Sequence, residues 1–378
     1  MRTDRLALRL TAVAILCLTS AARAQERGED VVRIRTRAVF VDALVKDKRT
    51  GQPVRDLARE DFQVFDDGRQ RDLTYFSREG DARERPLALV IALDLWGGRS
   101  FSYLKKAEVA EQLVAAVNKL SPEDEVGVML MWAEEERKGS DLFLGKCQMV
   151  NALTRDREKT AAALRAVPPR ATELEAYYKS LPATRPNISG PIGPPAGVSQ
   201  GGLACASDEV TRLGAGERAN ARVVMIALTD DLVPFDLDDR TEATRRLLSG
   251  GVTVSGLLMG DMSFADKIFF GITKPYVRAL GSGFSSVDYL AKQTGGEAVR
   301  VNRPGEFAGA VERLIEGLAS RYSLGFTLAE GERDDGRLHK LEVKVKARDA
   351  RGKERKLSVR ARRGYYVPGT RGGAPAVK

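Results

Sequence analysis

Two aspartates are the residues of this sequence best placed to do chemistry. Asp94 ends the apolar stretch 87–94, and Asp230 ends the apolar stretch 223–230. Unbroken apolar runs of this length are typical of strands buried on both faces of a parallel sheet. The two carboxylates would then lie at the carboxyl edge of the sheet, where open α/β folds bind ligands. Two oxygen ligands aimed at one point could hold Mg²⁺ or Mn²⁺ and support a metal-dependent hydrolase.

The rest of the sequence offers little support for catalysis. The sole histidine, His339, lies in a polar segment far from both aspartates, and we interpret it as a solvent-exposed residue near a turn. A Ser-His-Asp or Cys-His relay therefore has one possible base. A hydrolase would also be expected to carry a lysine or a second carboxylate close to Asp94, and residues 95–98 supply neither. We expect a protein that is not an enzyme.

The elements that must position the aspartates alternate between strand and helix. Further strands are expected at 125–132 and 252–259, with an antiparallel edge strand near 142–144. Helices are expected at 104–120, 156–167, 204–213, 239–248, 287–293 and 306–318. This alternation predicts a doubly wound, mostly parallel α/β domain of the Rossmann-like type.

Strand patterns also occur at both ends of the chain. Residues 39–46 alternate in polarity, and Asp67-Gly68 is a tight-turn signal between 62–65 and 73–76. Strands are again expected at 322–328, 341–346 and 357–362. We expect the two ends to share one β-rich unit beside the α/β domain, and an immunoglobulin-like sandwich is one candidate.

These observations divide the chain into successive segments. We expect a signal peptide at 1–24, a β-rich module at 25–82, an α/β domain at 83–320 with insertions near 168–200 and 260–284, C-terminal strands at 321–368 and a disordered tail at 369–378. Both insertions are interpreted as surface segments, and 168–200 is rich in Pro, Gly and Ser and is expected to bury little.

The first residues read as an export signal. Three arginines precede the short apolar stretch 10–18, and 22–24 is a small-residue cleavage site, so the mature chain should start at Gln25. The protein is therefore expected to be secreted or periplasmic, with no membrane-spanning segment. Cys147 and Cys205 remain in a compartment that permits disulfides, and whether they pair is open.

The charge pattern argues against nucleic-acid binding. The chain has a formal net charge of +9, from 61 Lys and Arg against 52 Asp and Glu. These residues are interleaved, whereas a nucleic-acid interface gathers basic residues on one face. We expect a mixed-charge surface and no nucleic-acid partner.

Six short stretches of the sequence match the motifs of one family, and they occur in the same order along the chain. They are 51–57, 60–68, 76–77, 290–296, 321–326 and 364–366. Together they resemble the von Willebrand factor A-related family of secreted bacterial proteins. The resemblance implies a binding module whose α/β domain holds a metal ion at its upper edge.

The resemblance also implies which residues would form that metal site. The family places an Asp and two alternate serines after the first strand, and adds a threonine and a second Asp. Asp94 and Asp230 match the aspartates, whereas Trp96, Gly98 and Leu203 stand where hydroxyl residues belong. We therefore expect a degenerate site and no cofactor, with weak Mg²⁺ or Mn²⁺ binding at Asp94 and Asp230 as the alternative.

A structural role is the alternative for these polar residues. Asp94 and Asp230 can cap helix N-termini, where carboxylates are favoured. Ser100 or Ser102 can cap the helix that follows the first strand.

The loops beside the aspartates are the candidate partner-binding surface. It comprises Trp96, Gly97, Gly98 and Asp231. Trp96 could anchor a partner, as tryptophan does at interface hot spots, or could fill the vacated metal pocket. We expect an exported binding module for an unidentified protein or cell-envelope component. A metal-dependent hydrolase, and a structural envelope or assembly factor acting through the β-rich unit, remain the alternatives.

Overall fold

The computed structural model describes most of the chain between Arg37 and Val367. Outside it lie 1–36, 79, 82–83, 97, 138–142, 182–201, 217, 219, 232–236, 261–284, 330–331, 334 and 368–378. The expected signal peptide, the tail and nearly all of the second insertion fall outside these described residues.

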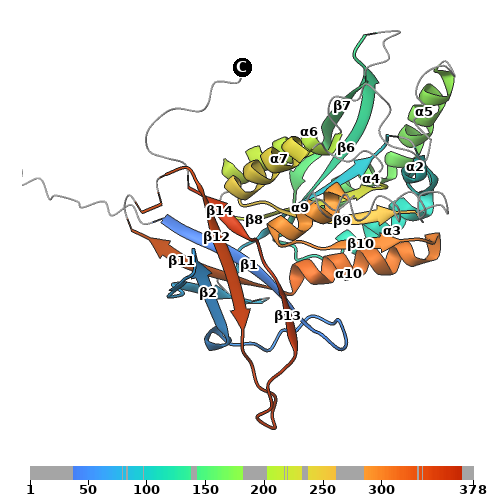
Figure 1. The fold of residues 1–378 in the computed structure, drawn as a ribbon. Helices are drawn as coiled ribbons and strands as arrows, with labels where there is room; N and C mark the ends of the chain where they lie inside the picture. The colour runs from blue at the N-terminus through green and yellow to red at the C-terminus, as the bar shows by residue number, and fades with distance from the viewer. Residues whose placement is uncertain are drawn as a thin grey trace, which may run out of the picture.

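A six-stranded sheet forms the centre of the α/β domain (Figure 1). Its strands are β5 (Leu87–Asp94), β6 (Glu125–Glu135), β7 (Phe143–Thr154), β8 (Arg222–Thr229), β9 (Thr253–Met259) and β10 (Ala298–Val301). The spatial order is β10-β9-β8-β5-β6-β7, and only the pairing of β7 with β6 is antiparallel. If these strands are numbered 1 to 6 along the chain, the order from β7 to β10 is 3-2-1-4-5-6, as in doubly wound folds. The chain order of the strands changes direction between β5 and β8.

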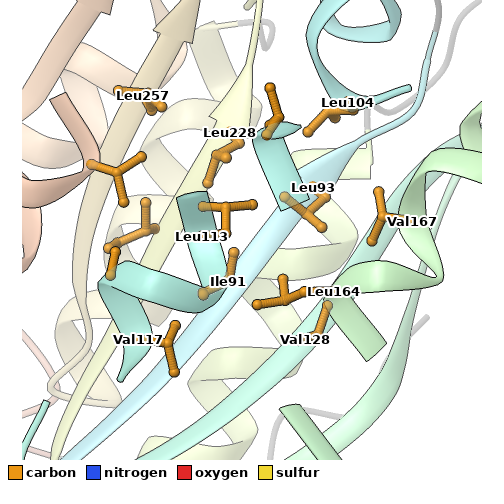
Figure 2. Close-up of a cluster of buried hydrophobic side chains, with 14 of the residues drawn as sticks. Ile91, Leu93, Leu104, Leu113, Val117, Val128, Leu164, Val167, Leu228 and Leu257 are labelled. Carbon is orange, nitrogen blue, oxygen red and sulfur yellow. The ribbon is translucent and has the colours of Figure 1, made fainter. Parts of the chain in front are cut away.

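Helices cover both faces of this sheet. They are α2 (Gly98–Leu104), α3 (Ala107–Val117), α4 (Arg157–Arg165), α5 (Val167–Ser180), α6 (Gly202–Ala215), α7 (Leu237–Ser249), α9 (Ser286–Thr294) and α10 (Phe307–Ala319). Side chains of α3, α4, α5 and α10 pack on one face, and those of α6, α7 and α9 pack on the other. Figure 2 shows the first of these cores, where Ile91 and Leu93 of β5 meet Leu113 of α3 and Leu164 of α4.

Two antiparallel four-stranded sheets form the β-rich unit, at the lower left of Figure 1. One has the order β13-β1-β11-β4 and the other β14-β12-β2-β3. The strands are β1 (Arg37–Asp47), β2 (Phe62–Asp66), β3 (Arg69–Arg71), β4 (Tyr75–Ser77), β11 (Arg321–Leu328), β12 (Leu338–Val345), β13 (Leu357–Arg360) and β14 (Gly364–Tyr366). Both sheets combine strands from the two ends of the chain, and a shared apolar core lies between them.

The hairpin at Asp67-Gly68 differs in part from the sequence expectation. Both residues have positive φ, 47° and 80°, as a tight two-residue turn requires. The strand that pairs with β2 across this turn is β3, however, and not the apolar run 73–76. That run contributes β4, which pairs with β11 in the other sheet.

Two further expectations are corrected by the structure. Residues 168–200 were expected to bury little, but the part within α5 buries Pro168, Ala171 and Leu174. The remainder from 182 to 200 lies outside the described residues. The prolines at the start of α5 had suggested a loop, although proline is accepted in the first turn of a helix. The expected helix 104–120 is also interrupted, because α2 ends at Leu104 and α3 begins at Ala107.

Covalent and polar links tie these elements together. Cys147 of β7 and Cys205 of α6 form a disulfide, with 5.7 Å between their Cα atoms. At the junction of the two units, Lys46 of β1 pairs with Glu297 at 2.7 Å. Arg321, at the start of β11, donates to the carbonyl of Gly295 at 2.9 Å.

Candidate functional site

The two aspartates meet where the strand order of the central sheet reverses. β5 and β8 are parallel neighbours, and Leu93 lies opposite Leu228 in their register. Asp94 and Asp230 therefore follow adjacent strands at the same edge, which is the ligand-binding position of doubly wound folds. We call this edge, with Asp94, Trp96, Asp230 and Asp231, the upper edge.

Asp94 is held by two hydrogen bonds at the upper edge. The Thr229 hydroxyl donates to its Oδ2 at 2.5 Å, and the amide of Trp96 donates to its Oδ1 at 3.0 Å. Burial raises the pKa of Asp94, although both bonds act to lower it. The carboxylate is thus removed from water and committed to neighbouring groups.

Asp230 and Ser100 bond to each other. The Asp230 amide donates to Ser100 Oγ at 3.1 Å, and the Ser100 amide approaches Asp230 Oδ2 at 3.4 Å. Ser100 is fully buried and lies inside the first turn of α2. It does not precede the helix as a capping serine would. Asp230 instead accepts from the helix amide, which links the end of β8 to α2.

Asp231 has the most unusual environment of the three carboxylates. Its φ is +57°, a left-handed conformation that Asp tolerates better than most residues. Its amide donates to Thr229 Oγ1 at 2.9 Å, while both carboxylate oxygens are shielded from solvent without a well-formed hydrogen bond. Burial raises the pKa of Asp231 to about 7, against opposing contributions from the nearby Ser285 hydroxyl, the Val287 amide and the Arg240 guanidinium.

Trp96 is directed into the protein. Its side chain is 9 % exposed and packs in a small cluster with Ala133 and Phe143, whose ring centroid lies 6.3 Å away. Little of the indole is available to a partner in this conformation. Gly97 lies outside the described residues, and Gly98 begins α2.

The hydroxyl groups of the upper edge are engaged in hydrogen bonds, whereas the two Asp231 carboxylate oxygens lack a well-formed one. Magnesium requires near-octahedral oxygen coordination. Here the hydroxyls of Thr229 and Ser100 are already bonded to Asp94 and to the Asp230 amide, and Leu203 of α6 packs among apolar side chains. Within the described residues, the one group of three acidic or histidine ligands within 4.8 Å is Asp66, Asp67 and His339, away from the upper edge.

The environment of His339 contradicts the sequence interpretation. The side chain is 2 % exposed rather than solvent-exposed. Its Nδ1 lies 2.9 Å from Asp67 and its Nε2 lies 3.0 Å from Asp335, and its ring packs beside Tyr365. The histidine is therefore part of the β-rich unit and cannot serve as a base for Asp94 or Asp230.

Two residues beside the upper edge, Thr229 and Arg240, were not predicted from the sequence, and Ser100 was predicted only as a possible helix cap. Thr229, directly before Asp230, bonds to both Asp94 and Asp231. Ser100 contacts Asp230, and Arg240 of α7 is a buried guanidinium beside Asp231. A hydroxyl at the end of a buried strand was a usable signal for Thr229. Nothing in the spacing of Arg240 indicated its position.

Comparisons with known proteins return distant structural matches. No family model and no curated protein matches the sequence. An aerotolerance-related membrane protein from Bacteroides fragilis matches with a TM-score of 0.32 and 13 % identity, over 61 % of this chain and 98 % of that chain. The SpRpn10 VWA domain matches with a TM-score of 0.31 and 13 % identity, over 60 % and 94 %.

A third match is the pilus adhesin SpaC from Lactobacillus rhamnosus GG, with a TM-score of 0.36 and 8 % identity, over 81 % of this chain and 48 % of that chain. The fold assignment rests on the strand order, the single antiparallel edge strand and the helices on both faces. The α/β domain has a von Willebrand factor A-like fold.

Proposed function

We propose that this protein is an exported, non-enzymatic binding module that recognises a protein or cell-envelope partner through its upper edge. Asp231 carries the proposal. A buried carboxylate with a raised pKa, on backbone with positive φ, is a costly arrangement that is common at functional sites. Its place at the reversal of strand order is the usual ligand position of the fold.

The surrounding contacts favour binding over catalysis. Thr229 and Ser100 bond to carboxylate or backbone groups of the upper edge, and neither contacts a histidine. Such a closed set of hydrogen bonds fixes the loop geometry, which lowers the entropic cost of binding. None of the helices in the described part of the chain has the length and apolar composition to cross a membrane.

The proposal is tested by capture from a cell-envelope extract with the mature chain immobilised. Asp231→Asn keeps the approximate side-chain shape but changes the hydrogen bonding of a buried group that holds the loop of the upper edge, and we expect it to weaken the affinity for the captured partner about tenfold. Asp72→Asn removes a carboxylate from an exposed position and serves as the control. Equal capture by both variants would place the binding surface elsewhere.

Two further measurements separate the alternatives. Addition of a chelator should leave the affinity unchanged, because the Thr229 and Ser100 hydroxyls are bonded to Asp94 and to the Asp230 amide, and Trp96, Gly98 and Leu203 offer no side-chain oxygen. The second measurement is phosphoester hydrolysis in the presence of Mg²⁺ or Mn²⁺. An activity that is lost in Asp94→Asn would support the hydrolase alternative instead of this proposal. Capture that survives all upper-edge variants and depends on the β-rich unit would support the assembly-factor alternative.

A further inference from the structure

A groove lies between the β-rich unit and the amino ends of the central strands. Its volume is about 350 Å³, within the range of ligand sites. One wall is formed by β1 from Arg37 to Asp42, and the other by the C-terminal ends of α6 and α7. Arg85, which precedes β5, and Arg362, which precedes β14, also line the groove. The upper edge lies at the opposite ends of the strands.

The wall formed by β1 is an open strand edge. β1 pairs with β11 along one edge from Arg37 to Leu44, but β13 covers the other edge only from Leu44 to Asp47. Within the described part of the chain, no strand pairs with the stretch before Leu44 on that second edge. Among the described residues, this edge therefore has no strand partner before Leu44, although the Phe40 carbonyl accepts from the Arg362 guanidinium.

The hydrogen bonds of β1 identify which residues face the groove. Val45 accepts from Val54 on the β11 side, whereas the Lys48 amide donates to Lys356 on the β13 side. Because the bonding direction alternates along a strand, even-numbered residues face the β13 side. The carbonyl of Phe40 agrees, since it accepts from the Arg362 guanidinium. The amides of Ala38, Phe40 and Asp42 accordingly point into the groove.

The groove is positively charged. Arg37, Arg85 and Arg362 outnumber Asp42, its one acidic lining residue, which leaves a net charge of +2. The guanidinium of Arg85 lies over the ring of Phe40 at 4.3 Å and 3.8 Å from Asp42. Arg362 Nε is buried without a hydrogen-bond partner.

The Arg362 guanidinium remains charged at neutral pH. Burial lowers its pKa to about 10, with Asp42 acting in the opposite direction. A buried donor with no acceptor is costly, and an incoming anionic group would satisfy it.

We infer that this groove binds an extended acidic segment of a partner protein, which adds to β1 as a further strand. The edge from Ala38 to Asp42 spans about 17 Å, enough for a strand of about five residues. Main-chain hydrogen bonds to β1 would provide the affinity, as in other cases of strand addition. Carboxylates of the segment would reach Arg37 and Arg362 and select acidic sequences.

The arginines of the groove also allow a second interpretation, in which they protect the strand edge from pairing. Charged side chains along a strand edge commonly prevent unwanted pairing. Arg362 and Arg85 could serve only to block the edge of β1, in which case no peptide would bind. The two readings differ in measurable ways.

The test uses the mature chain and a fluorescein-labelled peptide of about six alternating valine and glutamate residues, a typical strand length. Fluorescence anisotropy should show saturable binding that weakens with salt. A valine–lysine peptide should not bind. Amide hydrogen exchange, resolved by NMR, should show the amides of Ala38, Phe40 and Asp42 slowed by the acidic peptide. The amides of Val39 and Val41 should exchange slowly even without peptide, because they face β11.

Two variants test whether residues of the groove contribute to peptide binding. Arg362→Gln should weaken peptide binding about fivefold, whereas Arg351→Gln, at an exposed turn, should leave it within about twofold. Ala38→Pro removes one edge donor without touching the ladder to β11, and should also weaken binding. If Arg362→Gln lowers the melting temperature, the peptide affinity of Ala38→Pro still tests the inference.

Several results would overturn the inference. Equal binding of both peptides, or binding without protection at Ala38, Phe40 and Asp42, would exclude strand addition. Protection of these amides before peptide is added would mean that another segment of this chain, or a second copy, already occupies the edge. Absence of binding would leave the protective reading.

Discussion

The replacement Asp231→Asn should stabilise the protein in a strongly pH-dependent way. Asparagine keeps the shape of the side chain and, like aspartate, tolerates the left-handed backbone at φ +57°. The change therefore removes the ionisable group, and it replaces one carboxyl oxygen by an NH2 group that faces the Ser285 hydroxyl and the Val287 amide. Its effect on stability reports whether the folded protein holds this carboxyl group neutral.

The sign follows from the direction of the pKa shift. Burial raises the pKa of Asp231 from 3.8 to about 7, so between these values the folded state keeps a proton that the unfolded state has lost. Stability contributed by this group is fully present below pH 3.8 and falls as the pH rises through the window. At about 1.4 kcal/mol per pH unit, the penalty approaches about 4 kcal/mol above pH 7, and relaxation around Arg240 would reduce it.

Urea unfolding from pH 4 to pH 8.5 measures this difference directly. The free energy of unfolding of Asp231→Asn, minus that of the parent protein, should be near zero at pH 4 and reach a positive plateau above pH 7. Asp72→Asn, at an exposed position, is the control for loss of one carboxylate. A variant less stable than the parent at pH 8 would refute the reasoning, because it would mean that the ionised carboxylate forms a stabilising pair with Arg240.

Three further predictions concern the elements around this site. Ser100→Ala should lower the free energy of unfolding by about 1 kcal/mol, because it removes the hydrogen bond that Ser100 Oγ accepts from the Asp230 amide; an unchanged urea midpoint would contradict this. Replacing Cys147 and Cys205 by alanine should cost about 4 kcal/mol, since the bridge closes a separation of 58 residues, and titration of the denatured parent should find no free thiol in the mature chain. Trp96→Ala should cost about 3–5 kcal/mol in urea unfolding, as expected for a buried ring, and a cost below about 1 kcal/mol would indicate an exposed indole.

The central sheet could be predicted because its signal is local. β5 and β8 are buried on both faces, and their unbroken apolar runs reported this directly. The carboxyl edge then followed from the parallel topology, which placed Asp94 and Asp230 on neighbouring strands. The short edge strand β10 was not predicted, because its four residues include Arg300 and give no clear period.

The errors and the open alternatives concern residues whose surroundings come from distant parts of the chain or depend on the direction of a side chain. His339 lies against Asp67, 272 positions away in the sequence. Its polar sequence neighbours therefore suggested solvent exposure, although the side chain is buried. The disulfide between β7 and α6 likewise depends on the packing of two elements separated by the first insertion. For Trp96, a role as an anchor for a partner and a role in filling the metal pocket stayed equally open. The sequence of a loop does not specify whether an indole points toward solvent or into the protein.

The two proposed surfaces can be tested independently because of where β5 begins and ends. Arg85 stands just before this strand and lines the groove, whereas Asp94 closes the strand at the upper edge. The strand has eight residues, which separates the surfaces by about 25 Å. At this distance mutational effects normally add within about 0.5 kcal/mol. A partner that contacts only the upper edge should therefore respond to Asp231→Asn and not to Arg362→Gln. A partner that bridges both surfaces should show the sum of the two losses in the double variant, and a loss larger than the sum would indicate that the sheet transmits a change between its two ends.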